Sequence, residues 1–271
     1  MQTIDIKDVL NYCYCPMYYK FRHQDKYKDK VILTTEKFDN DIHEAIYNYL
    51  SLMQLGYKVD LKILNKKFIT KWLGKNKKID DILYVEPNNI KDIYERKRRN
   101  ALVSLRELNK FFLKYPFYPM IVNKKYKVPI AKNLYLTGNL ELVREINGLI
   151  ELICFKTDDR HNNNKVYVDK DIEITAGVYA YEQITGNKID MITFYGLERN
   201  KITATTRNAE DFKMLKKIIV NVYACIKNNI IYPCSNINCI NCIYNKICVK
   251  ELNYGNLTLK ESESNDENKR E

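Results

Sequence analysis

The sequence lacks any run of about 18 or more apolar residues, the length that indicates a membrane-spanning helix. No membrane span is therefore expected. The first residues, MQTIDIKDVLNYCYCP, carry acidic side chains early and have no long apolar segment, unlike a secretory signal peptide. Internal repeats are also missing. These absences favour a cytoplasmic protein over a membrane, secreted or repeat protein.

An acidic excess is absent as well. The 45 lysine and arginine residues outnumber the 34 aspartate and glutamate residues, which gives a formal net charge of +11 at pH 7. A basic excess of this size favours a polyanionic partner, most often nucleic acid. The alternative is a composition rich in lysine, asparagine, isoleucine and tyrosine throughout, which would raise the charge without such a partner.

Length and composition favour one folded domain. A chain of 271 residues with 45% hydrophobic content can bury a substantial core. We expect this domain to span residues 1–255, with a helical insert at about 57–115 and a cysteine-rich segment at 231–250. Residues 256–271 form a charged tail that is expected to be disordered.

The spacing of apolar residues changes along the chain. Helical spacing predicts helices at 4–12, 37–53, 61–73, 90–113, 171–183 and 208–228. From residue 120 the period changes to two, which predicts strands at 124–130, on both sides of the hairpin dipeptide Asn147-Gly148, at 190–197 and at 201–205. Residues 157–170 are expected to form a polar loop. This order favours an α/β (α+β) fold with a mixed central sheet flanked by helices.

The expected helix at 90–113 carries a run of basic side chains. Arg96, Arg98 and Arg99, with Lys97 between them, lie on the side opposite the apolar stripe. Such a run can follow a phosphate backbone, so these arginines are candidates for DNA binding. A solvated helix face is the alternative.

Eight cysteines in a chain expected in the cytoplasm argue against a disulfide framework. Three of them, Cys239, Cys242 and Cys248, have the tight spacing of a metal site. Thiolates select zinc or iron–sulfur centres. Cys234 as fourth ligand would make a local zinc knuckle, whereas Cys15 would make a staple between the two ends of the chain. Ordinary buried cysteines are the remaining alternative.

The hairpin brings a carboxylate and a lysine together. Glu141 lies on its first strand, and Lys156 ends its second. Metal-dependent phosphodiester cleavage uses carboxylates that hold a divalent ion and a lysine that stabilises the transition state. His43, on a preceding helix, is a further candidate ligand, particularly for manganese. The alternatives are that Glu141 and Lys156 are a solvent-facing pair on neighbouring strands, and that His43 is an ordinary packed histidine.

Six motifs together resemble a known family. They are, in chain order, the opening segment Tyr12-Cys13-Tyr14-Cys15-Pro16, His43 on its helix, Gly138-Asn139-Leu140-Glu141, Ile153-Cys154-Phe155-Lys156-Thr157, the stretch from Thr175 to Tyr179, and the closing cysteines 239, 242 and 248. In order and approximate spacing they resemble the RecB-like branch of the PD-(D/E)XK nucleases. The resemblance covers roughly residues 4–248. It is greatest to the CRISPR-associated and helicase-linked exonucleases that carry a four-cysteine iron–sulfur cluster.

The resemblance implies a restriction-endonuclease-like fold and a metal-dependent DNA exonuclease or endonuclease. His43 and Glu141 would hold Mg²⁺ or Mn²⁺, with position 154 as the third metal position. Lys156 would act on the attacking water, and Tyr179 and Thr175 would contact the substrate.

The same resemblance implies cofactors and partners. A 4Fe–4S cluster would be held by Cys15, Cys239, Cys242 and Cys248, which leaves Cys13 and Cys234 as spare thiols. The substrate would be single-stranded DNA or duplex ends. A protein partner in a repair, phage or CRISPR-type complex is a further implication.

Three positions depart from the family's pattern. Glu141 stands in place of aspartate, Thr175 in place of glutamine, and Cys154 in place of the second metal-binding carboxylate. A thiol is a poor ligand for magnesium. Glu151 is three residues from Cys154 and points to the opposite face of a regular strand. A replacement carboxylate would therefore come from Glu173, Asp158 or Asp159.

Two other functions stay open at this point. One is a catalytically degenerate DNA-binding or assembly subunit, in which the cluster serves only as a structural staple. The other is a zinc-stabilised interaction module that has no role with nucleic acid.

Overall fold

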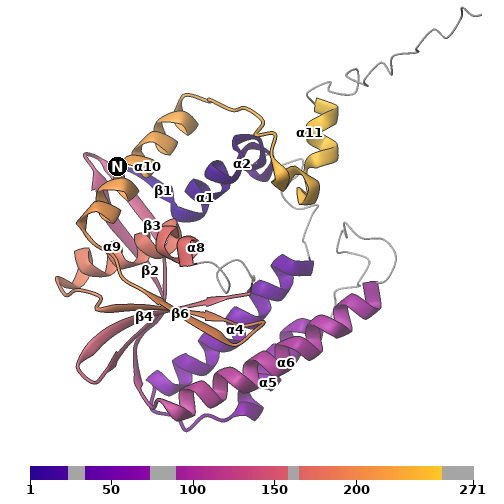
Figure 1. Cartoon of the computed structure of the whole chain (residues 1–271), viewed down its shortest axis with the longest axis vertical. Helices are drawn as coiled ribbons and strands as arrows, with labels where there is room; N and C mark the ends of the chain where they lie inside the picture. The colour runs from indigo at the N-terminus through magenta and orange to yellow at the C-terminus, as the bar shows by residue number, and fades with distance from the viewer. Residues whose placement is uncertain (24–33, 74–89, 158–164, 252–271) are drawn as a thin grey trace, which may run out of the picture.

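The computed structural model describes residues 1–23, 34–73, 90–157 and 165–251 (Figure 1). In chain order the elements are β1 (Gln2–Asp5), α1 (Ile6–Tyr14), α2 (Pro16–His23), α4 (Thr34–Gln54), α5 (Leu61–Leu73), α6 (Ile90–Lys114), β2 (Tyr118–Ala131), β3 (Leu134–Ile146), β4 (Leu149–Lys156), α8 (Lys165–Lys170), α9 (Ile172–Thr185), β5 (Met191–Gly196), β6 (Lys201–Thr205), α10 (Ala209–Lys227), the 3₁₀ helix η2 (Ile237–Asn241) and α11 (Asn245–Glu251). The expected tail at 256–271 and the candidate acids Asp158 and Asp159 lie outside the described residues.

The sheet confirms the expected fold class. Its strands follow the order β1-β3-β4-β5-β6, and β2 also pairs with β3. The pairs β1/β3 and β4/β5 are parallel and the others antiparallel, so the sheet is mixed. Helices flank it: α4, α5 and α6 lie together on one side, and α1, α9 and α10 on the other (Figure 1). The fold is α+β. No helix of the described ranges is long and apolar enough to cross a membrane.

Each face of the sheet has its own apolar core. The α9-side core joins the sheet to α1, α9 and α10 and includes Leu140, Leu152 and Cys154. The α4-side core joins the opposite face to α4, α5 and α6 and includes Leu142 and Phe155. The predicted helices before the sheet thus form the cover of one face, where Leu64, Phe68, Leu105 and Leu108 are fully buried.

Strand β3 is forked along one edge. Strand β2 pairs with β3 from Leu134 to Glu145 and occupies the other edge. On the forked edge, β1 pairs with residues 134–137 and β4 pairs with residues 142–146. Residues 138–141 between them are paired with neither strand. A gap of this kind leaves room for a cleft beside the strand, and Glu141 lies within it.

The regular alternation of β3 breaks at Glu141. Leu140 and Leu142 are two residues apart, yet they pack in cores on opposite faces of the sheet. Opposite Glu141, between the pairs Val122–Leu142 and Lys124–Leu140, Asn123 has a positive φ of 42°. Asparagine tolerates this conformation better than most residues. Such local irregularities redirect side chains, and here Glu141 is turned toward the fork.

Several predicted boundaries were wrong for tertiary reasons. The predicted helix at 4–12 begins only at Ile6, because Gln2–Asp5 pairs with β3 in a parallel ladder. The predicted strand at 124–130 is longer, because β2 follows β3 over almost its whole length. Part of the expected polar loop, Lys165–Lys170, is helical and buries Val168. The hairpin at Asn147-Gly148 is confirmed, with both residues at positive φ.

A buried ion pair lies under α6. The Arg144 Nε atom of β3 is 2.5 Å from Glu151 Oε2 of β4, and both side chains are at most 4% exposed. Thr193 donates its hydroxyl hydrogen to the other Glu151 oxygen. The rings of Phe111 and Phe117 lie 5.3 and 4.7 Å from the Arg144 guanidinium. Glu151 therefore serves the core of this face, away from Cys154, as the strand period predicted.

Candidate functional site

A cleft of about 1250 Å³ opens at the fork in β3. Its walls come from α1, α2, α4 and α9, and strands β1, β2, β3 and β4 also contribute lining residues. The residues with titratable or polar groups that matter for chemistry are His43, Tyr47, Glu141, Cys154, Lys156 and Glu173. Four of the sequence-predicted site residues, at positions 43, 141, 154 and 156, therefore share one cavity.

Glu141 is held at the fork by the neighbouring strand. Because β4 no longer pairs with β3 here, the backbone N–H of Phe155 donates to Glu141 Oε2 at 3.0 Å. Burial and the nearby Glu141 carboxylate raise the pKa of the Tyr47 hydroxyl well above its usual value. Burial raises the pKa of Glu141, while His43 and Lys156 act to lower it. The result is an enclosed carboxylate with a fixed position and a raised proton affinity.

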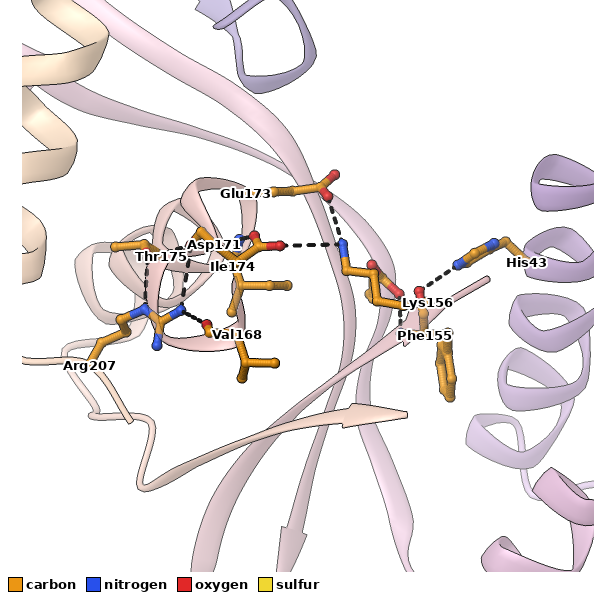
Figure 2. A network of polar contacts seen from close by, with 10 residues as sticks. His43, Phe155, Lys156, Val168, Asp171, Glu173, Ile174, Thr175 and Arg207 are labelled. Atoms are coloured by element: carbon orange, nitrogen blue, oxygen red, sulfur yellow. Dashed lines mark hydrogen bonds and ion pairs between the residues drawn. The ribbon is translucent and has the colours of Figure 1, made fainter. Parts of the chain in front are cut away.

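Lys156 lies among carboxylates. Its Nζ atom is 3.0 Å from Glu173 Oε2 and 3.9 Å from Asp171 Oδ2 (Figure 2). Burial alone would lower the pKa of Lys156, but Glu173, Asp171 and Glu141 together raise it well above its usual value. Lys156 is therefore a persistent ammonium group, and Glu173 is a second cleft carboxylate close to it.

The first turn of α9 sets the position of Glu173. Asp171 caps the helix by accepting the N–H of Ile174 at 2.9 Å. Arg207 fixes the same turn by donating from Nε to the Thr175 hydroxyl and from Nη2 to the Val168 carbonyl, both at 2.7 Å (Figure 2). Two separate contacts thus hold α9 where Glu173 can reach Lys156.

His43 faces two backbone carbonyls. Its Nδ1 lies 2.7 Å from the oxygen of Asp39, and its Nε2 lies 2.9 Å from the oxygen of Phe155. Burial would lower the pKa of His43, but Glu141, Asp39 and the two carbonyls raise it. Two acceptors suit a ring that donates from both nitrogens. Both ring nitrogens of His43 thus face carbonyl oxygens, and its role as a metal ligand stays a prediction.

Cys154 is sealed between the sheet and the cleft. The residue is 0% exposed and belongs to the α9-side core. Burial raises the pKa of its thiol well above the usual value, and the nearby Glu141 raises it further. A neutral buried thiol cannot replace a carboxylate as a ligand for a hard cation.

Other predicted site residues lie away from the cleft. Glu173 and Gly177, four residues apart on α9, line it, so Thr175 and Tyr179 fall on the other side of the helix. Thr175 instead accepts a hydrogen bond from Arg207, and the Tyr179 hydroxyl donates to the Pro129 carbonyl at 2.9 Å. The predicted DNA-binding residues of α6, Arg96, Arg98 and Arg99, also do not line it.

Sequence reasoning missed several residues of the site. Tyr47 follows His43 by four residues on α4, so helical spacing could have placed both on one face. Asp171 stands where a helix cap is expected, but nothing local indicates that it also approaches Lys156. Arg207 is far away in sequence and meets α9 only in the folded chain.

The side chains of the cleft determine whether Mg²⁺ or Mn²⁺ fits there. Within the described residues, no group of three or more His, Cys, Asp or Glu side chains is arranged to hold a metal ion. Of the five acidic residues that line the cleft, Glu141 and Glu173 are the two whose charges act on Lys156. Magnesium is commonly bound by one or two carboxylates, with waters and substrate phosphates completing its coordination. The carboxylate pair therefore fits such an ion, and Cys154 does not.

A second cavity, of about 340 Å³, is lined by cysteines. Cys15 comes from the junction of α1 and α2, and Cys234, Cys239, Cys242 and Cys248 come from the C-terminal segment. Cys234 donates its backbone N–H to Cys15 Sγ at 3.5 Å. Met17, Phe21 and Tyr244 form a small apolar core beside the cavity. The two ends of the described chain are thus brought together around thiols.

The cysteine-lined cavity does not distinguish zinc from an iron–sulfur cluster. Either centre needs thiolates that converge on one site, and the described residues contain no group arranged to hold a metal ion. Burial raises the pKa of Cys234 and of Cys248, and the neighbouring thiols raise both further. Five cysteines line the cavity, which is enough to supply the four thiolates of either kind of centre. Cys13 is exposed and does not line the cavity.

Comparisons with known proteins identify no family. No family model matches the sequence, and no curated protein matches it. Among solved structures, one described as "Crystal structure of SSO0001" is similar with a TM-score of 0.43 and 11% sequence identity, over 91% of this chain and 85% of that chain. A similarity at this level carries no argument about function.

Proposed function

We propose that the protein is a metal-dependent deoxyribonuclease of the RecB-like kind, in which Glu173 takes the place of the carboxylate that Cys154 lacks. The observation that carries this proposal is the ion pair of 3.0 Å between Lys156 and Glu173, in the same cleft as Glu141. A lysine flanked by two carboxylates beside a forked strand is the group set that metal-assisted phosphodiester cleavage requires. The net charge of +11 favours the polyanionic substrate.

Each residue of the cleft has a distinct part in this proposal. Glu141 and Glu173 would hold Mg²⁺ or Mn²⁺, which when bound polarises a phosphoryl oxygen and lowers the pKa of water. Lys156 stays charged because its pKa is raised, so it stabilises negative charge that develops on the phosphate. His43 donates to the Phe155 carbonyl and thereby holds the end of β4 in position.

Cleavage of DNA tests the proposal directly. We expect the purified full chain, with Mn²⁺ or Mg²⁺, to degrade a labelled single strand or the ends of a duplex, and to lose this activity in a chelator. A gel or fluorescence assay of the labelled products measures it. The proposal is wrong if the parent protein leaves both single-stranded and duplex DNA intact under these conditions.

A second candidate function is favoured by the side-chain arrangement itself. His43 has both ring nitrogens directed at carbonyls, and the described residues hold no three-ligand metal group. Both observations suit a degenerate nuclease fold that binds DNA or assembles with other proteins without cutting. Cleavage by the Cys154→Asp variant, with none by the parent, would favour this function.

For the cysteine-lined cavity we propose a 4Fe–4S cluster held by Cys15, Cys239, Cys242 and Cys248. The support is that these four thiols line one cavity, where the two ends of the described chain meet. A cytoplasmic setting suits free thiolates, because cytosolic thiols are kept reduced. We also retain a protein partner in a repair, phage or CRISPR-type complex as part of the proposal.

Metal analysis tests the cluster. Protein purified without oxygen should be brown, absorb visible light, and contain about four iron atoms per chain. Cys239→Ser should lose most of the iron, whereas Cys13→Ser, a matched change at an exposed thiol outside the cavity, should retain it. A colourless protein with one zinc ion would contradict the cluster and favour a zinc-stabilised interaction module.

A further inference from the structure

One wall of the cleft carries groups that the proposed chemistry does not use. Lys7 and Asn11 lie four residues apart on α1, and Tyr18 and Arg22 lie four residues apart on α2. All four line the cleft that contains Glu141 and Lys156. The Arg22 Nη1 atom lies 3.4 Å from the Tyr18 hydroxyl. The two short helices thus present two cations, an amide and an aromatic ring to one space.

The opposite wall differs in character. Helix α4 contributes the neutral residues Asn40, Asn48 and Ser51 and the acids Asp39 and Glu44 to the same cleft. Its acid Glu44 is in an ion pair with Lys71, 2.7 Å away. The cations Lys7 and Arg22 therefore lie on the α1–α2 wall, with Asp5 at the start of α1, whereas the α4 wall carries polar and acidic groups. Such a pairing suits an anionic polymer with hydrogen-bonding bases.

The depth of the reacting groups limits the form of that polymer. The side chains of Lys156 and His43 are 13% and 14% exposed, so they lie below the rim of the cleft, and that of Glu173 is 34% exposed. A base-paired duplex keeps its strands stacked and paired, and reaching a recessed group costs unpairing energy. A single strand can enter such a cleft without that cost. The cleft therefore favours a single strand.

We infer that Lys7, Asn11, Tyr18 and Arg22 form a binding subsite for single-stranded DNA next to the reacting groups. Lys7 and Arg22 pair with backbone phosphates, Tyr18 stacks on a base, and Asn11 hydrogen-bonds to the strand. The inference rests on the proposed function for its substrate, DNA, and does not depend on cleavage.

Helix α2 also connects this subsite to the cysteine-lined cavity. Tyr18 lines both cavities, and its ring centroid lies 5.3 Å from that of Tyr244. Replacement of Tyr18 by alanine would therefore disturb both places. Lys7 and Arg22 line the cleft but not the cysteine-lined cavity, so they are the decisive positions for a test.

The test measures strand affinity without catalysis. A fluorescein-labelled oligodeoxythymidine of about 15 nucleotides is titrated with the full chain, without divalent metal, and followed by fluorescence anisotropy at several salt concentrations. Lys7→Gln and Arg22→Gln should each weaken binding about tenfold and reduce the slope of log K against log salt by about 0.7. Lys20→Gln, on α2 but outside the cleft, and Lys132→Gln, beside the turn between β2 and β3, remove the same charge and should change affinity less than about twofold.

Each result has a defined meaning. Equal losses of affinity in all four variants would mean that only net charge matters, and would overturn the subsite. A parent that does not bind the single strand, or that binds a blunt duplex more tightly, would also overturn it. If the parent binds and the two cleft variants are selectively weakened, the subsite stands even when no DNA is cut. If the parent cuts DNA while those variants bind like their controls, the subsite fails and the proposed function remains.

Discussion

Replacing Glu173 with glutamine is expected to lower the rate of DNA cleavage by about 10²- to 10³-fold, the range found when one transition-state stabiliser is removed. The change removes one of the two carboxylates proposed to hold the metal ion and the closest charged partner of Lys156. Glutamine has nearly the same size and shape, so the first turn of α9 should keep its place through Asp171 and Arg207. The measurement is the single-turnover rate with saturating Mn²⁺.

The matched control is Glu182→Gln, on the same helix but outside the cleft, which should leave the rate within about twofold. Binding of Mn²⁺ by calorimetry without DNA gives a second measurement, and Glu173→Gln should weaken it while Glu182→Gln should not. Activity retained at the parent's level in Glu173→Gln would show that the second acid lies elsewhere. A loss of helix content in that variant would reveal a structural effect, which circular dichroism would detect.

Truncating Glu151 to alanine is expected to lower the free energy of unfolding by about 3–5 kcal/mol. Arg144 would then remain 3% exposed and charged beneath α6 without its carboxylate. Its Nη1 atom already has no hydrogen-bond partner. The buried charge of Arg144 is therefore stabilised mainly by the ion pair with Glu151 and by the rings of Phe111 and Phe117. Urea denaturation followed by circular dichroism measures the change.

Two further variants make this result interpretable. The double change Arg144→Met with Glu151→Leu removes both charges and should recover most of the lost stability, because apolar groups of similar size often replace buried ion pairs well. Glu145→Ala, at an exposed site next to Arg144 on β3, should stay within about 0.5 kcal/mol of the parent. A double variant as unstable as Glu151→Ala would mean that the cost arises from packing rather than from an unpaired charge.

Residues with strong local signals were predicted well. Asn147-Gly148 requires positive φ at both positions, so it fixed the hairpin, and Asn208 forms the expected cap of α10 with a capping box through Asp211. The fork in β3 could not be predicted, because it depends on two strands, β1 and β4, that share one edge and come from distant parts of the chain.

The candidate site divides in the same way. Motif spacing selected His43, Glu141, Cys154 and Lys156, which do lie on one cleft. It also selected Thr175 and Tyr179, which α9 turns away from that cleft, because a helix presents only every third or fourth residue to one side. The acid that approaches Lys156 was one of three sequence candidates, and the other two lie outside the described residues.

By itself the sequence determined the class of fold, the hairpin, the basic charge and the grouping of cysteines, because each depends on residue type and spacing along the chain. Only the tertiary structure decided which carboxylates balance the charge of Lys156 and which groups His43 contacts. The ion pair of Lys156 with Glu173 and the two carbonyl contacts of His43 join groups that local spacing does not relate. Their proton affinities are set by burial and by neighbouring charge, which exist only after the cores on both faces of the sheet have formed.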